Sequence, residues 1–148
     1  MKIIMLVYFT YRLFLLIKST KQRLNYKEFQ ESGRMAKEAY RKMLGTYPPE
    51  YHEALNMIVT VIMVFVQLVH IWLCTYLCVS TQNVGLKILC YTEVAATIYT
   101  WLTHWKEIKS ELFNGNNEKL TYHRFEEIFG VLLGYACYIT AIITLISK

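Results

Sequence analysis

Residues 57–79 read MIVTVIMVFVQLVHIWLCTYLCV and contain no Lys, Arg, Asp or Glu. A helix that spans a bilayer needs about 20 consecutive, predominantly apolar residues, so this run is long enough to cross one. Residues 88–105 form a second apolar run that only Glu93 and His104 interrupt, and residues 128–147 form a third run without any charge. These runs predict an integral membrane protein.

The composition agrees with this class. Hydrophobic residues make up 55% of the chain and charged residues only 18%, compared with roughly 25% charged residues in a typical soluble domain. The sequence contains no GxSxG, HExxH or P-loop motif. We therefore expect a protein without enzymatic activity, and with no catalytic residue, no cofactor and no metal site.

Turn-forming residues divide the chain into long helices. The prolines at 48 and 49, the Ser80–Asn83 stretch and the Asn-rich stretch 114–117 are the main breaks. A helix over 48–80 would be roughly 48 Å long, which exceeds a hydrocarbon core of about 30 Å. The sequence thus predicts an all-α, polytopic membrane helix bundle in a single domain, 1–148. Its long transmembrane helices are expected at 48–80, 86–113 and 121–147, and their ends form a small cytoplasmic collar with an amphipathic helix at 25–45.

The N-terminal apolar run, Ile3 to Ile17, is short and carries Arg12. We expect an apolar helix over residues 1–17. Two interpretations stay open for it, a short fourth transmembrane span or a helix that lies in the interface or re-enters the membrane.

Basic residues are distributed unevenly between the connections. Residues 18–43 carry eight Lys or Arg and residues 106–127 carry four, whereas residues 80–87 carry one. The positive-inside rule therefore places 18–54 and 106–127 in the cytoplasm, and it places 80–87 and the C-terminus outside. We expect the basic 18–43 segment to contact anionic lipid headgroups and not nucleic acid, for which no motif is present.

Polar side chains form a seam inside the apolar runs. At 100° per residue, four of them share one face of the 86–113 helix, and two more lie on one face of the 48–80 helix. Since the short turn at 80–86 makes these helices antiparallel, Glu93 and His70 fall within about one helical turn in depth. Intramembrane ionisable groups usually face a bundle interior and find a partner. The predicted seam consists of Glu93, Thr97, Thr100, His104, His70 and Gln67.

The last apolar run has a face of small residues. Gly130 and Gly134 form a GxxxG pattern, and Cys137 and Ala141 continue the same face. Small residues allow close approach of a second helix, so we predict a packing surface here. The four cysteines all lie in apolar runs, and a disulfide between Cys78 and Cys90 stays open.

Two functions remain compatible with these features. The first is a non-enzymatic small integral membrane subunit that forms homo-oligomers or docks into a larger membrane complex. The second is a small oligomeric ion or proton channel, or a membrane-permeabilising effector, that uses the polar seam of Glu93 and His70.

Overall fold

The computed structural model describes the backbone of residues 1–113 and 121–147, and the side chains of residues 1–106 and 121–147. Within these residues the protein is built from α-helices and one 3-10 turn, which confirms the all-α fold class. Residues 114–120 of the predicted connection 106–127 lie outside the described residues. The elements are α1 (Lys2–Leu24), α2 (Tyr26–Gly45), η1 (Pro49–Tyr51), α3 (His52–Ser80), α4 (Val84–Phe113) and α5 (Arg124–Ile146).

Three helical segments of the described chain are long and apolar enough to cross a membrane. They are α1, the Pro49–Ser80 segment that joins η1 to α3, and α5. The described part of α4 is not apolar enough to be counted with these three segments. The prediction counted it as a confident span, but Lys87, Glu93 and several tyrosines and threonines lower its mean hydropathy.

α1 is longer than the predicted helix over residues 1–17. It continues to Leu24 because the basic residues after Ile17 change the surface of the helix without breaking it. Asn25 separates α1 from α2, and its side chain accepts a hydrogen bond from the backbone N–H of Lys27. Such a bond satisfies one of the free N–H groups at a helix start, which explains why α2 begins here.

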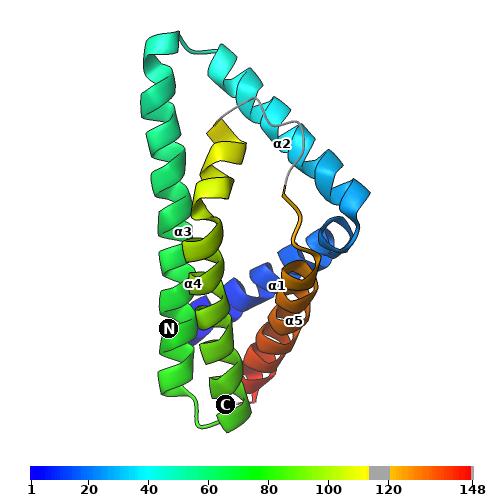
Figure 1. The fold of residues 1–148 in the computed structure, drawn as a ribbon. Helices are drawn as coiled ribbons and strands as arrows, with labels where there is room; N and C mark the ends of the chain where they lie inside the picture. Colours follow the sequence, from blue (N-terminus) through cyan, green and yellow to red (C-terminus); the bar gives the residue numbers. More distant parts are fainter. Residues whose placement is uncertain (114–120, 148) are drawn as a thin grey trace.

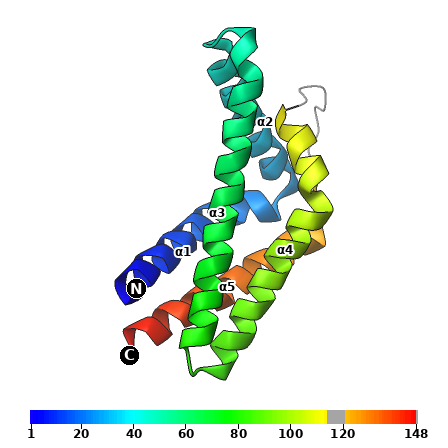
Figure 2. The same cartoon turned by 90° about the vertical axis from the view of Figure 1, so that its left-hand side faces the viewer.

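The long helices form two antiparallel pairs, α1 with α5 and α3 with α4 (Figures 1 and 2). Both termini and the turn between α3 and α4 lie toward one end of the molecule, and α2 lies toward the other (Figures 1 and 2). α2 connects the end of α1 to the start of α3, so the chain passes from one pair to the other through it (Figure 1).

The turn between α3 and α4 is held by its own side chains. Thr81 is buried and accepts a hydrogen bond from the backbone N–H of Asn83. The Asn83 side chain in turn accepts from the backbone N–H of Leu86. These bonds cap the start of α4 and place it at Val84, two residues earlier than the sequence predicted.

Among the described residues, α2 contacts other elements at both of its ends. Near its start, the rings of Tyr26 and Phe29 pack on Tyr122. Near its end, Tyr40 donates a hydrogen bond to the Asn56 side chain of α3. No residue of α2 is fully buried. α2, the amphipathic helix of the predicted collar, therefore connects the two helix pairs, and most of its apolar side chains are exposed.

The buried core is concentrated at the end that carries the termini and the α3–α4 turn. All four long helices contribute to it, and four cysteines fill space between the larger side chains. Thiols are small and apolar enough to pack in this way. The core includes Met5, Phe9, Leu73, Cys74, Leu77, Cys78, Leu86, Cys90, Cys137, Ala141 and Leu145.

Candidate functional site

Glu93 and His70 meet between α4 and α3. Glu93 lies nine residues after Val84, and His70 lies ten residues before Ser80, so both are about 14–15 Å from the turn that joins their helices. The Glu93 Oε1 atom is 3.5 Å from His70 Nε2. His70 is 1% exposed and Glu93 8% exposed, so both side chains are buried inside the protein.

The other two long helices supply the remaining partners. The Tyr138 hydroxyl of α5 donates a 2.9 Å hydrogen bond to Glu93 Oε1. Arg12 Nη2 of α1 donates a 3.1 Å bond to the Tyr138 hydroxyl, and the Tyr8 hydroxyl lies 2.8 Å from His70 Nδ1. Five polar side chains thus form one continuous chain of contacts, which we call the polar chain: Tyr8, His70, Glu93, Tyr138 and Arg12.

The polar chain balances its own charge. Arginine stays protonated in proteins, so Arg12 contributes a cation that compensates the carboxylate of Glu93 through the bridging Tyr138. A His70 tautomer with the proton on Nε2 can accept from Tyr8 at Nδ1 and present its N–H toward Glu93. Burying charged groups is costly unless they are paired and hydrogen-bonded, and this arrangement meets both requirements.

The members of the polar chain lie at a similar level along their helices. Arg12 is ten residues after the start of α1, and Tyr138 is eight residues before the end of α5. These separations correspond to about 15 Å and 12 Å from the end of the molecule that carries the termini. The chain of contacts therefore runs across the bundle, from one helix to the next, and not along the helix axes.

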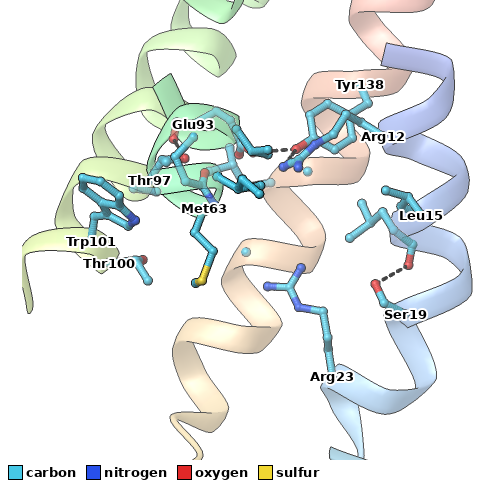
Figure 3. A pocket seen from close by; sticks show the side chains of 18 residues that line it. Arg12, Leu15, Ser19, Arg23, Met63, Glu93, Thr97, Thr100, Trp101 and Tyr138 are labelled. Carbon is cyan, nitrogen blue, oxygen red and sulfur yellow. Dashed lines mark hydrogen bonds between the residues drawn. The ribbon is translucent and has the colours of Figure 1, made fainter. Parts of the chain in front are cut away.

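An open pocket of about 510 Å³ lies beside the polar chain, between the two helix pairs. Figure 3 shows Arg12 and Tyr138 on one side of it and Glu93, Thr97 and Trp101 on the other. Of the predicted seam, Glu93, Gln67, Thr97 and Thr100 line this pocket. The other lining residues are Arg12, Leu15, Leu16, Ser19, Arg23, Ile62, Met63, Val66, Ala96, Trp101, Gly130, Leu133, Gly134 and Tyr138.

The residues of the predicted seam do not all lie together, because His104 is separated from the others. Thr97 donates a hydrogen bond to the backbone carbonyl of Glu93, so its side chain reinforces α4 itself. His104 lies eleven residues beyond Glu93, about 16 Å further along the helix. There it contacts Glu126 and the His123 ring instead of the polar chain.

The small face of α5 lies against α1. A Cβ atom added to Gly134 would stand 3.0 Å from a Leu16 methyl carbon, and one added to Gly130 would stand 3.0 Å from the Arg23 guanidinium. Ala141 is fully buried at the other end of this face. Both glycines therefore lie in close contact with side chains of α1.

The cysteines are all free thiols, so the disulfide that stayed open for Cys78 and Cys90 is not formed. Cys78 instead lies near the backbone carbonyl of Lys87. Cys90 points toward Cys137 on α5, with 3.9 Å between the sulfur atoms. Cys137 thus contributes to the core between α4 and α5, while the glycines of its face contact α1.

Sequence reasoning missed three members of the polar chain. Tyr8 and Tyr138 gave no signal, because a tyrosine in an apolar run can have many roles. Arg12 offered the strongest clue. A cation ten residues from one helix end and a carboxylate nine residues from another suggest a pair at one depth.

Comparison of the chain with protein-family models, with curated proteins and with solved structures gave no match.

Proposed function

We propose that this protein is a non-enzymatic, integral membrane subunit that assembles with further copies of itself or with other membrane proteins. The observation that carries the proposal is the open pocket between the helix pairs, which Arg12, Arg23 and Glu93 line. An Arg or Asp near the centre of a bilayer costs about 2.5–3.5 kcal/mol on insertion scales. A helix from a neighbouring subunit would cover the exposed part of Arg12, which lies at the level of Glu93, and would pack against the apolar side chains beside it.

The same proposal places all four long helices across the membrane. α4 is included because it pairs with α3 and because Glu93, the one acidic residue inside its apolar run, is buried toward the other helices. The bias of basic residues places 18–54 and 106–127 in the cytoplasm, and it places the α3–α4 turn and the C-terminus outside. The two termini and that turn lie toward the same end of the molecule, in agreement with this topology (Figure 2).

The topology is testable by labelling single cysteines in a cysteine-free background. Gln82 is a suitable position in the α3–α4 turn, because it is exposed and, unlike Asn83, makes no capping bond. Tyr47, which is exposed between α2 and η1, is a suitable position at the other end of the molecule. A membrane-impermeant maleimide should label Gln82→Cys from outside intact cells and label Tyr47→Cys only after permeabilisation. Labelling in the reverse pattern would refute the proposed orientation.

The basic segment 18–43 is proposed to contact anionic lipid headgroups at the cytoplasmic surface. Its lysines and arginines lie at the end of α1 and along α2, where Lys21 pairs with Glu28 across the junction and Arg34 lies near Glu38. Basic residues near an anionic surface each contribute about 1 kcal/mol of attraction.

If subunits assemble through the pocket, substitutions of two neighbouring alanines of α4 should affect the assembly differently. Ala96 lines the pocket, whereas Ala95 is exposed outside it. Ala96→Trp should fill the pocket and release single chains, while Ala95→Trp should leave the assembly intact. Light scattering of the full-length protein in mild detergent gives the mass of the complex for comparison with 17.5 kDa. A wild-type mass of one chain, without a co-purifying protein, would contradict the proposal.

The second candidate is an oligomeric ion or proton channel, or a membrane-permeabilising effector. It is favoured by one observation, that the buried carboxylate of Glu93 also lines an open pocket. Intramembrane carboxylates often mark proton or ion paths. Against a path through one chain, the core beyond Glu93 is packed with apolar side chains and thiols. Proton flux in proteoliposomes that disappears in Glu93→Gln would favour the channel over the subunit.

A further inference from the structure

A second cluster of polar side chains lies outside the polar chain, where α4 approaches the start of α5. It contains His104 of α4, His123, which precedes α5, and Glu126 in the first turn of α5. One ligand atom from each residue lies within 4.8 Å of the other two. His104 Nε2 is 2.8 Å from Glu126 Oε2, and the two imidazole rings have centroids 4.3 Å apart.

These three side chains are the donors that zinc uses in many proteins. Zn²⁺ takes imidazole nitrogen and carboxylate oxygen at about 2.0–2.2 Å and prefers a tetrahedral arrangement. Ligand atoms at these distances stand about 3.3–3.5 Å apart. The 2.8 Å pair needs to open slightly and His123 to move inward, changes that side-chain rotation can supply.

The position of the cluster suits capture of an ion from water. His104 lies twenty residues after Val84, about 30 Å from the end of the molecule that carries the core. The His104 side chain is 14% exposed and the Glu126 side chain 35% exposed, so both ligands are partly shielded but still reachable from solvent. Glu127, the next residue, is already paired with Arg23 at 2.6 Å, which leaves Glu126 as the carboxylate for the ion.

We propose that His104, His123 and Glu126 form a binding site for Zn²⁺, with water in the fourth position. The ion would cross-link α4 to the start of α5 across the connection between them. Because both imidazoles and the carboxylate belong to this one chain, the site does not depend on assembly or on the pocket beside Glu93. His104 lies nineteen residues before His123, so no single short sequence motif contains all three ligands.

The test uses the full-length protein in detergent, purified with an affinity tag that contains no histidine and stripped of metal with a chelator. Calorimetric titration with Zn²⁺ should give one ion per chain, and Zn²⁺ should raise the thermal unfolding temperature. Co²⁺ should give the visible absorption of a four-coordinate site. Losing an outer partner of a metal ligand commonly costs 10–100-fold in affinity, so losing a ligand should cost at least about 100-fold.

Three ligand variants, His104→Gln, His123→Gln and Glu126→Gln, should each weaken Zn²⁺ binding in this way. His123→Gln is the most informative of the three, because the His123 side chain makes no capping bond to α5 and its replacement therefore removes no such bond from the fold. His52→Gln is the matched control, since His52 bonds to backbone carbonyls near the end of α2, away from the cluster. Absence of Zn²⁺ binding in the wild type, or an unchanged affinity in His123→Gln, would overturn the proposal.

Discussion

Replacement of Glu93 by leucine is expected to destabilise the fold by about 1–3 kcal/mol for each buried polar group that it leaves without a hydrogen-bond partner. Leucine leaves the Tyr138 hydroxyl and the His70 imidazole without their shared acceptor, and it leaves Arg12 as an uncompensated charge. Thermal or denaturant unfolding of the protein in detergent micelles, followed by circular dichroism, measures the loss.

A double-mutant cycle separates this effect from simple loss of packing. Arg12→Met combined with Glu93→Leu removes both charges, so the double variant should be more stable than the sum of the single changes predicts. Glu93→Gln should cost much less than Glu93→Leu, because the amide oxygen still accepts from Tyr138. Glu31→Leu, at an exposed position of α2, is the control and should change stability by no more than about 0.5 kcal/mol. A near-silent Glu93→Leu would mean that the polar chain does not stabilise the fold.

The helices were predictable because their causes are local. Apolar runs, the stretch at Ser80–Asn83 and the prolines before α3 each act on their own part of the chain, and the helices begin and end near them. The error at α1 has a local cause as well. The prediction ended the helix where the apolar run ends, whereas a helix ends only where its backbone is capped or broken, here at Asn25.

The polar chain was predictable only in part because its contacts are not local. The antiparallel arrangement of α3 and α4 follows from a short turn, and that arrangement is what placed Glu93 near His70. The pairing of α1 with α5 has no such turn to fix it, since more than 120 residues separate Arg12 from Tyr138. Periodicity also grouped His104 with Glu93 on one face, and both residues do contact α5. They lie about 16 Å apart along α4, however, so Glu93 meets Tyr138 and His104 meets Glu126.

Gly134→Ile is expected to weaken the contact between α1 and α5. Even a Cβ atom at this position would stand 3.0 Å from a Leu16 methyl carbon and 3.5 Å from the Tyr138 ring. Isoleucine adds three further carbons at this tight contact between the two helices. Overpacking of a buried contact typically costs about 1–3 kcal/mol. Because Tyr138 bridges Arg12 and Glu93, a shift of α5 away from α1 should also strain the polar chain and move the cost toward the upper end of this range.

Leu16→Ala is the companion change that identifies the cause. It makes room beside residue 134, so the combination of Leu16→Ala with Gly134→Ile should be less damaging than the two single variants added together. Gly45→Ile is the control, since a Cβ atom there meets nothing within 4 Å. The measurement is the unfolding temperature, in detergent, of the wild type, the two single variants, the double variant and the control. Strictly additive effects would show that Leu16 and Gly134 do not touch. A clear positive coupling would locate the close approach of α1 and α5 at this pair, which is the contact that holds Arg12 within reach of Tyr138.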